Sequence, residues 1–386
     1  MQAMRILASA VGAVLLIGTS ISVLKTLVMP GGRIGRLYMT VGASVDRVFR
    51  LAVQRVPDYQ RRDRILAFQA PVVLAALLIS WLAAFLLGFG LVLWPGVGHL
   101  AGALRESGSS LFTLGFASTN RGGPTVIDFL AGAGGLIVVA LQIAYLPTLY
   151  SAFNRRETEV TLMAVRAGLP AWGPELLARS SFTITTEDLP NFYRQWERWA
   201  ADVAESHSSY PILLRFRSTH PMTSWLIALL AVMDSAALFS AVAPDELPVQ
   251  GRLFLAMGSR CLRQLAGTVG IGYDPDPRPD AGIALTRQEF DRGIERLQSV
   301  GFHMQRTPDE AWPHFQGWRV NYESIIYELA YRLDLVPAAW SGPRRSGEPP
   351  MAPKLIINRT PERPEGAPVL SRGKAAESGV DKGTST

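Results

Sequence analysis

The sequence predicts an all-α membrane protein with three transmembrane helices and a mainly helical domain after them. Of its 386 residues, 48% are hydrophobic and only 18% are charged, and the mean hydropathy is +0.17. These values are too apolar for an ordinary soluble protein and too polar for a chain that lies in the bilayer throughout. The other two observations are three long apolar runs in the N-terminal part and a helical spacing of apolar residues after them.

Three apolar runs reach the roughly 20 residues that a helix needs to cross about 30 Å of hydrocarbon. They are Ile6 to Met29, Ala67 to Trp94 and Ile127 to Phe153. The first run follows Arg5, and the alternative is a cleaved signal peptide. It is long for a signal and lacks a small-x-small cleavage site followed by a polar mature domain. We therefore expect residues 1–30 to form a retained transmembrane helix.

Basic residues predict the orientation of the chain. Lys and Arg outnumber Asp and Glu between Lys25 and Arg64, so the linker of residues 31–66 should be cytoplasmic. The N-terminus then lies outside, and the segment between the second and third runs faces outward. Arg155 and Arg156 follow the third run and mark its return to the cytoplasm. These features predict a multi-pass protein of the cell membrane, with lipid around its spans.

Charge and residue chemistry argue against several classes of function. The net charge of +6 and the isoelectric point near 9.6 suggest nucleic-acid binding, but much of the basic charge flanks the second run, where anionic headgroups attract it. We expect no nucleic-acid partner. Cys261 is the single cysteine, and the 5 histidines lack ligand spacing, so we expect no cofactor and no enzymatic activity. The preference for Arg over Lys is typical of a GC-rich bacterial genome.

Residues 154–340 predict a mainly helical cytoplasmic domain, because their apolar residues recur at helical spacing. Residues 286–289 (Thr-Arg-Gln-Glu) have the form of a capping box that opens one helix. Trp225 to Val242 is apolar enough for a fourth span, but it is short and contains Asp234, which is costly in a bilayer. We predict a buried central helix there. Residues 341–386 are rich in Pro, Gly, Ser and basic side chains, which predicts a disordered tail.

The segment between the second and third runs has the features of a pore loop. His99 to Phe112 can form a short helix, and Ser110 to Ser118 follows as a polar loop. The C-terminus of such a helix carries partial negative charge, which favours a nearby cation. Gly115 permits a positive φ, so alternate carbonyl groups can point along one direction. Because non-helical backbone at membrane depth must be enclosed or line water, one loop per chain predicts several chains around a pore.

The pattern Ser110-x-x-Thr113-Leu114-Gly115-Phe116-Ala117-Ser118 resembles the Thr-x-x-Thr-Val-Gly-Tyr-Gly-Asp signature of potassium channel pore domains, the family in which carbonyl coordination of the ion is established. The resemblance covers a pore domain of residues 67–153. It implies that the main-chain carbonyls of Thr113, Leu114, Gly115 and Phe116 bind the permeant potassium, with Ala117 next in the filter. Thr113 and Gly115 are the expected metal-binding positions, and a homotetramer is the expected assembly.

The chain departs from the family's pattern in three ways. Arg105 and Glu106 occupy pore-helix positions that the family often fills with aromatic residues. Ala117 stands where the family has its second glycine, and an L-residue forced into left-handed geometry costs about 1–2 kcal/mol. Ser118 replaces the aspartate, and Ser109 stands where many members have an acidic residue. We expect Ser109, Ser110 and Ser118 to support the loop, with no carboxylate behind it. These departures bear on potassium selectivity more than on pore formation.

In the third run, the glycines Gly132, Gly134 and Gly135 have two interpretations. They are a gating hinge, or they allow close helix packing, as small residues often do in membranes. Gln142 is the only polar side chain deep in this run, and it either faces an inner cavity or bonds a neighbouring helix. Tyr145 is expected to narrow the inner mouth.

Two functions therefore remain open. The first is a passive potassium or monovalent cation channel whose cytoplasmic domain regulates or assembles the pore. The alternative is a non-conducting, membrane-anchored sensor or scaffold that acts through its cytoplasmic helical domain. In that case residues 113–117 form an ordinary polar loop between spans. The sequence does not identify a cytoplasmic ligand in either case.

Overall fold

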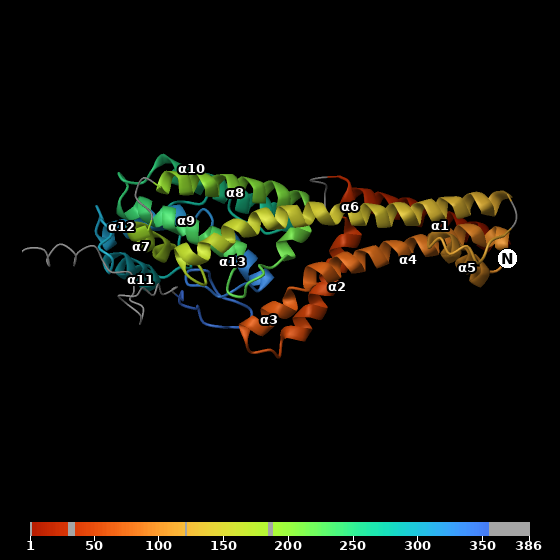
Figure 1. The fold of residues 1–386 in the computed structure, drawn as a ribbon, viewed down its shortest axis with the longest axis horizontal. Coiled ribbons are helices and arrows are strands. Elements are labelled where there is room, and N and C mark those ends of the chain that lie inside the picture. Colours follow the sequence, from red (N-terminus) through yellow and green to blue (C-terminus); the bar gives the residue numbers. More distant parts are fainter. Residues whose placement is uncertain (1, 30–34, 120–121, 184–187, 355–386) are drawn as a thin grey trace, which may run out of the picture. The chain divides into compact units, whose positions relative to one another are not determined.

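A computed structural model describes residues 2–29, 35–119, 122–183 and 188–354, and all regular secondary structure in these ranges is helical (Figure 1). The predicted all-α class is confirmed. The helices are α1 (Gln2–Leu27), α2 (Arg36–Val53), α3 (Tyr59–Leu66), α4 (Gln69–Val97), α5 (Leu100–Leu111), α6 (Gly122–Ala167), α7 (Gly173–Thr183), α8 (Leu189–Ser209), the 3-10 helix η1 (Pro211–Arg215), α9 (Trp225–Val242), α10 (Val249–Val269), α11 (Arg287–Gln298), α12 (Pro308–Arg319) and α13 (Glu323–Leu333).

The chain divides into two compact units. Residues 1–56 and 65–151 form the first, and residues 57–64 and 152–386 form the second. The predicted linker of residues 31–66 is therefore not one segment: α2 belongs to the first unit, whereas residues 57–64 belong to the second. The amphipathic α2 packs on α4, where Gln69 donates to Asp46 at 2.6 Å. Residues 30–34 lie outside the described part.

Helices α1, α4, α6 and α9 are long and apolar enough to cross a membrane. The first three cover the three predicted spans, as a membrane protein requires. All 18 residues of α9 are buried, and α7, α10, α12 and α13 pack around it. A helix enclosed in this way has no face left for lipid, so the prediction of a buried central helix is confirmed.

The acidic residue of α9 is satisfied inside the second unit. Tyr322 donates its hydroxyl to the Asp234 carboxylate at 2.8 Å, and the buried Arg319 forms an ion pair with the same oxygen. Arg319 also pairs with Glu323 at 2.8 Å. A buried carboxylate is tolerated only with such partners, which explains why an acidic residue can lie in this apolar helix.

Helix α1 packs along α4 through glycines. A Cβ atom on Gly12 would lie 2.7 Å from the carbonyl oxygen of Gly88, and one on Gly88 would lie 2.7 Å from Leu16. Small residues allow this close approach of two membrane helices. Trp81 of α4 is buried and donates its indole N–H to the Ser22 hydroxyl of α1 at 3.2 Å. The first helix is thus a packed part of the first unit.

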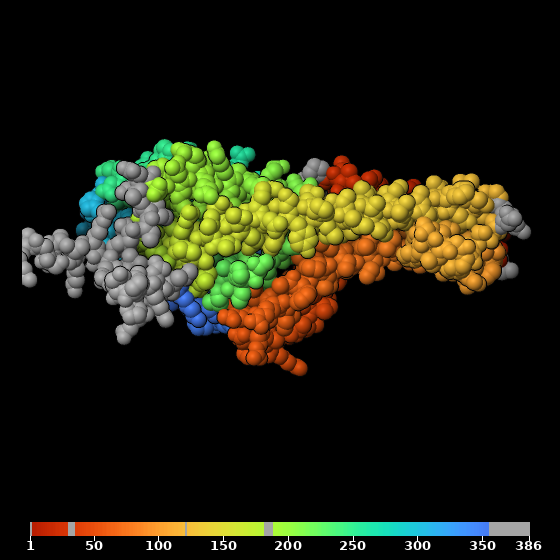
Figure 2. Space-filling model, viewed as in Figure 1, coloured from red at the N-terminus to blue at the C-terminus, as the bar shows by residue number. Residues whose placement is uncertain are grey.

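Helix α6 continues for 46 residues, well past the end of the predicted third span at Phe153. No Gly or Pro follows Phe153 until Gly168, so nothing in the sequence ends the helix earlier. Within the first unit one side of α6 is buried and the other is apolar and exposed; Phe129, Leu136 and Ile143 are 74%, 66% and 63% exposed. Figure 2 shows this helix, in yellow, uncovered along the face in view.

Arg156 holds α6 where the helix enters the second unit. Its buried guanidinium donates to the carbonyl oxygens of Leu213 at 3.0 Å and Phe216 at 2.8 Å. It also lies 3.0 Å from Nε2 of His207, whose Nδ1 lies 3.0 Å from the Ser206 hydroxyl. These partners assign a neutral imidazole with its proton on Nδ1. Burial, and then the charge of Arg156, lower the pKa of His207 well below 6.5.

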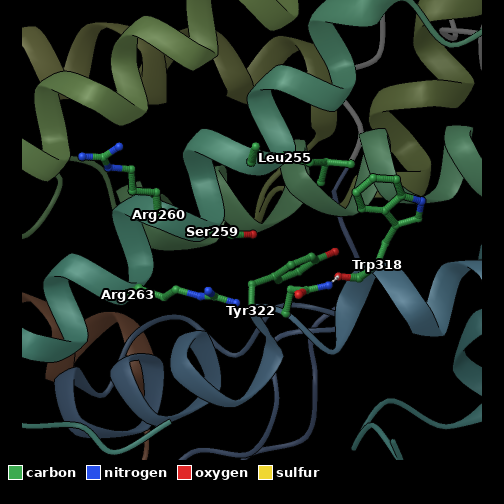
Figure 3. A pocket seen from close by; sticks show the side chains of 8 residues that line it. Leu255, Ser259, Arg260, Arg263, Trp318 and Tyr322 are labelled. Carbon is green, nitrogen blue, oxygen red and sulfur yellow. Dashed lines mark hydrogen bonds between the residues drawn. The ribbon is translucent and has the colours of Figure 1, made fainter. Parts of the chain in front are cut away.

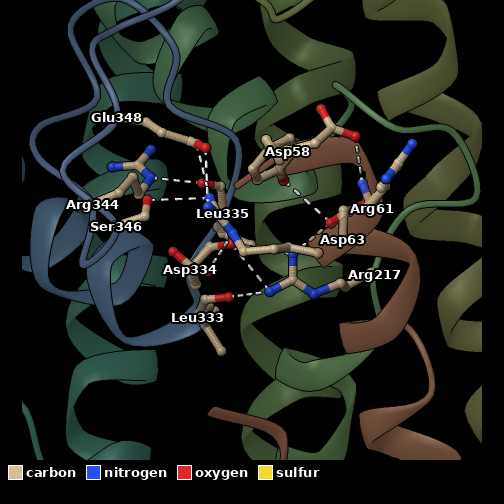
Figure 4. A network of polar contacts seen from close by, with 12 residues as sticks. Asp58, Arg61, Asp63, Arg217, Leu333, Asp334, Leu335, Arg344, Ser346 and Glu348 are labelled. Carbon is tan, nitrogen blue, oxygen red and sulfur yellow. Dashed lines mark hydrogen bonds and ion pairs between the residues drawn. The ribbon is translucent and has the colours of Figure 1, made fainter. Parts of the chain in front are cut away.

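Ion pairs hold residues 57–64 in the second unit (Figure 4). The buried Arg62 donates to both carboxylate oxygens of Glu348, at 3.0 and 2.8 Å, and lies 3.7 Å from Asp334. Arg217 pairs with Asp63 at 2.5 Å. Bidentate arginine–carboxylate pairs are among the stronger polar contacts in proteins. Because α3 ends at residue 66 and α4 begins at residue 69, this network lies directly before an apolar helix of the first unit.

Part of the predicted tail is ordered. Ser341 and Arg344 are buried, and Arg344 donates to the carbonyl oxygens of Leu335 at 2.7 Å and Val336 at 2.8 Å. The prediction of disorder from residue 341 is therefore wrong up to residue 354. The low apolar content of this segment suggested disorder, but polar side chains that bond to the backbone hold it in place. Residues 355–386 lie outside the described residues.

Replacing Gly12 with valine should separate α1 from α4, because the added carbon atoms would collide with the Gly88 backbone. Overpacking of this kind costs about 1–3 kcal/mol, so the melting temperature of the purified protein should fall. Gly18→Val is the matched control, since Gly18 lies on the same helix with nothing within 4 Å of its added Cβ. Equal melting temperatures for G12V and the unchanged protein would contradict the close packing.

Acidification should destabilise the second unit through His207. Because folding lowers its pKa, the unfolded chain takes up a proton below its ordinary value of 6.5 that the folded chain does not. The free energy of unfolding should therefore decrease by up to about 1.4 kcal/mol for each pH unit below that value. His207→Gln keeps an acceptor for Arg156 and should remove this part of the slope. Urea unfolding of both proteins across this pH range measures it, and identical slopes would refute the assignment.

Candidate functional site

The short helix α5 lies where the sequence predicts one. Its N-cap is His99 and its C-cap is Phe112, which match the predicted range of residues 99–112. The preceding helix α4 ends at Val97. Its C-cap Gly98 has a left-handed φ of 95°, which lets the chain turn at once into α5.

Helix α5 packs closely against α4. Ser107 donates its hydroxyl to the carbonyl oxygen of Leu86 at 2.9 Å. A Cβ atom on Gly90 would lie 2.6 Å from Leu104. Both contacts join the middle of α5 to the C-terminal half of α4, so this face of α5 is fixed.

The C-terminal end of α5 packs against α6. A Cβ atom on Gly135 would collide with the carbonyl oxygen of Leu111, and one on Gly132 would lie 3.2 Å from the carbonyl oxygen of Ser110. The Ser110 hydroxyl donates to Asp128 of α6 at 2.7 Å. Helix α5 therefore lies between α4 and α6, and the loop of residues 112–119 starts at a fixed point.

The backbone N–H groups of the 112–119 loop turn back toward α5. The carbonyl oxygen of Ser109 accepts from the N–H of Leu114 at 2.8 Å and of Gly115 at 3.3 Å. The Ser109 hydroxyl accepts from the N–H of Ala117 at 2.9 Å. Thr113 and Gly115, two residues apart, have positive φ values of 56° and 70°. Ala117 does not, so the left-handed strain expected at this residue is absent.

The carbonyl oxygens of the same loop have no such partners. Within the described residues, no hydrogen bond ends on the carbonyl oxygen of any residue from 113 to 117. Most backbone carbonyl groups in folded proteins are paired with protein or water. The loop therefore directs its donors to its own helix and leaves a run of acceptors available.

The loop also exposes apolar side chains. Leu114 is 62% exposed and Phe116 is 56% exposed in the single chain. The guanidinium of Arg105 lies 5.4 Å from the ring centroid of Phe116, a cation–π contact that holds the ring on α5. Both side chains therefore keep a large exposed area in the single chain.

A carboxylate does support the loop, contrary to the sequence-based expectation. Glu106 of α5 is buried, and its two oxygens accept from the N–H of Thr119 at 2.7 Å and from the Thr119 hydroxyl at 2.6 Å. The expectation rested on Ser118 and on Ser109, which lies one turn after Glu106 on the helix. Because Glu106 lies one turn earlier, it reaches the end of the loop rather than its middle.

The remaining residues that the sequence singled out, Ser118 and residues of α6, do not all take the expected roles. Ser118 is exposed and makes no hydrogen bond to any described residue. Gly132 and Gly135 meet the carbonyl end of α5, a contact that fits the packing alternative, and α6 is a continuous helix through them; a hinge stays a prediction. Gln142 and Tyr145 are buried on the side of α6 that faces its own chain, which favours packing over lining an inner mouth. The Gln142 side-chain oxygen makes no hydrogen bond to a described residue, so bonding to a neighbouring helix stays a prediction.

Three residues that hold the loop and the end of α5 were not assigned this role from the sequence: Glu106, Asp128 and Thr119. One rule could have identified two of them from the sequence: ionisable residues beside or within apolar spans cost free energy in a membrane and tend to serve a function. Glu106 and Asp128 are the acidic residues between Trp94 and Phe153, so this rule would have selected both. Thr119 carried no comparable signal, because a hydroxyl residue in a polar loop is ordinary.

No protein-family model, curated protein or solved structure matches this chain at a significant level.

Gly135→Ala should displace the end of α5, because its methyl group would occupy the position of the Leu111 carbonyl oxygen. We expect a loss of about 1–3 kcal/mol, measured as a lower melting temperature of the purified protein. Gly134→Ala is the matched control on the same turn, since its Cβ would lie 3.7 Å from Phe89, an ordinary contact. If the two variants melt alike, the close approach of α6 to α5 is incorrect.

Proposed function

We propose that the protein is a passive channel for potassium or other monovalent cations, in which the 112–119 loop forms the ion filter. The observation that carries this proposal is the run of carbonyl oxygens from residue 113 to residue 117 without hydrogen-bond partners in the described chain. Such oxygens replace the water shell of a cation in a selectivity filter. The alternating positive φ values at Thr113 and Gly115 support the proposal, because they allow successive carbonyls to face one side.

A homotetramer is the assembly that this function requires. One loop supplies carbonyl oxygens from one side only, so several copies are needed to surround an ion. The exposed apolar side chains of the loop and of α6, such as Phe116 and Phe129, are suited to contact neighbouring chains and lipid. The partial negative charge at the C-terminus of α5 favours a cation near the loop.

The proposed filter has the oxygen ligands of a cation site, but its outer end at Ala117 differs from that of the family the sequence resembles. Thr113, Leu114, Gly115 and Phe116 supply the carbonyl oxygens, as in the family that the sequence resembles. Ala117 lacks the positive φ of a second filter glycine, and its N–H bonds Ser109. We therefore propose weaker discrimination between potassium and sodium than a filter with glycine at this position would give.

In the proposed topology the N-terminus lies outside and the second unit lies in the cytoplasm, where it regulates the pore. Two covalent connections support this role. Helix α6 runs without a break from the first unit into the second, where Arg156 holds it. The segment held by Arg62 and Asp63 leads directly into α4. A movement within the second unit would therefore act on both apolar helices that flank the loop.

Purified protein in liposomes should pass potassium down its gradient, and Gly115→Asp should lower that flux by about tenfold or more, because a carboxylate and a strained backbone would disturb the carbonyl run. A potassium-sensitive dye with valinomycin as the positive control measures the flux. Gly301→Asp is the matched control, because Gly301 has the same φ of 70° and equally open surroundings in the second unit. We expect it to leave the flux unchanged.

The flux experiment also separates the alternative function. A folded protein that passes no monovalent cation at any voltage or pH would leave a non-conducting sensor or scaffold, acting through the second unit, as the remaining interpretation. Equal fluxes for G115D and the unchanged protein would show that ions do not pass through this loop.

A further inference from the structure

The second unit contains a cavity of about 360 Å³ between α10 and the segment that joins α12 to α13 (Figure 3). Residues on one face of α10 form one wall, and Trp318, Asn321 and Tyr322 form the other. The α10 residues are Leu255, Ala256, Ser259, Arg260 and Arg263. The volume is at the lower end of the roughly 300–1,000 Å³ that is usual for small-molecule sites, so a ligand here must be small.

The two arginines of this cavity have no carboxylate partner among the described residues. Other arginines of the second unit do pair; Arg296, for example, lies 2.6 Å from Glu175. The Nε atom of Arg263 is buried and makes no hydrogen bond within the described chain. Leaving a buried donor unpaired costs about 1–3 kcal/mol, so an anion that accepts from Arg263 would be stabilised.

The two guanidinium groups lie differently (Figure 3). Arg263 extends toward Tyr322 and also lies 5.9 Å from the ring centroid of Tyr273. Arg260 is exposed at the rim and extends away from the cavity. Exposed side chains change rotamer rapidly, so Arg260 can turn toward a ligand that Arg263 holds.

The opposite wall of the cavity presents two aromatic side chains and one hydrogen-bond acceptor, the side-chain oxygen of Asn321. The indole of Trp318 is partly exposed, whereas the Tyr322 hydroxyl is already bonded to Asp234 at 2.8 Å, so Tyr322 offers only its ring. The Asn321 side-chain nitrogen donates to the carbonyl oxygens of Gly317 and Trp318, at 3.0 and 3.2 Å. Its side-chain oxygen makes no hydrogen bond within the described residues and can accept from a ligand.

We propose that this cavity binds a small aromatic carboxylate or phosphate. Arg263 and Arg260 hold the anionic group, since guanidinium forks match carboxylate and phosphate oxygens. The ring lies against Trp318 and Leu255, where stacking and burial favour it. A hydroxyl or amine on the ligand donates to Asn321. The unpaired positive charge disfavours cations, and the volume excludes polymers.

The test uses the full-length protein in lipid nanodiscs and isothermal titration calorimetry. The probes are phenyl phosphate and benzoate, compared with inorganic phosphate and with phenol. Inorganic phosphate lacks the ring and phenol lacks the charge, so each loses one half of the interaction. We expect at least one of the two aromatic anions to bind about tenfold more tightly than both comparison compounds.

Variants locate the site. Arg260→Gln combined with Arg263→Gln should weaken binding of the aromatic anion by about tenfold or more. Trp318→Leu should weaken binding of the aromatic anion and leave the affinity for inorganic phosphate unchanged. Arg252→Gln is the matched control, because Arg252 is exposed on the same helix and does not line the cavity. Melting temperatures show whether each variant is folded, and Trp318→Leu keeps the test decisive if the double variant is not.

The proposal is overturned if neither aromatic anion binds up to about 10 mM, a concentration well above millimolar dissociation constants. It is also overturned if a folded double arginine variant binds as tightly as the unchanged protein, or if Arg252→Gln weakens binding equally. Because the readout is binding, a failed ion-flux experiment would not affect this result, and absent binding would not affect the channel proposal.

Discussion

The conformation of the 112–119 loop depends on two residues of α5, Glu106 and Ser109. Ser109 accepts three backbone N–H groups of the loop through its carbonyl and hydroxyl oxygens, and Glu106 accepts the N–H and hydroxyl of Thr119. Because the N–H donors of the loop bond to α5, its carbonyl oxygens remain available on the side away from α5. Gly135 in turn fixes the end of α5, since any side chain there would meet the Leu111 carbonyl. The proposed filter therefore depends on how closely three helices approach one another.

The sequence predicts most of the elements that position this loop. Apolar runs and the polar interval between them predict α1, α4, α5 and α6, because spans and short helices follow from local composition. The third span was predicted to end at Phe153, whereas α6 runs to Ala167. Periodicity cannot show where a helix leaves one unit and enters another. The ordered residues 341–354 were missed for a different reason: Arg344 holds them through the backbone carbonyls of Leu335, Val336 and Ser341, and composition does not show such side-chain-to-backbone bonds.

The details of both candidate sites depend on contacts between segments distant in sequence. Glu106 reaches Thr119 only because the loop folds back on α5, and a serine at position 109 gave no reason to look one turn earlier. Arg260 and Arg263 of α10 also could not be singled out, because what distinguishes them is their position in the wall of a cavity, which only the folded chain shows. Some other arginines of the second unit, such as Arg296 and Arg319, form ion pairs, and sequence alone does not show which do.

The most direct test of the channel proposal is an electron cryo-microscopy structure of the full-length protein in lipid nanodiscs with potassium chloride. The proposal predicts four chains around one axis, with the 112–119 loops innermost and ion density between layers of carbonyl oxygens from Thr113 to Phe116. The side chains of Leu114 and Phe116 should point away from the axis. A monomer, or an assembly in which these loops face lipid or bulk water away from any shared axis, would contradict it.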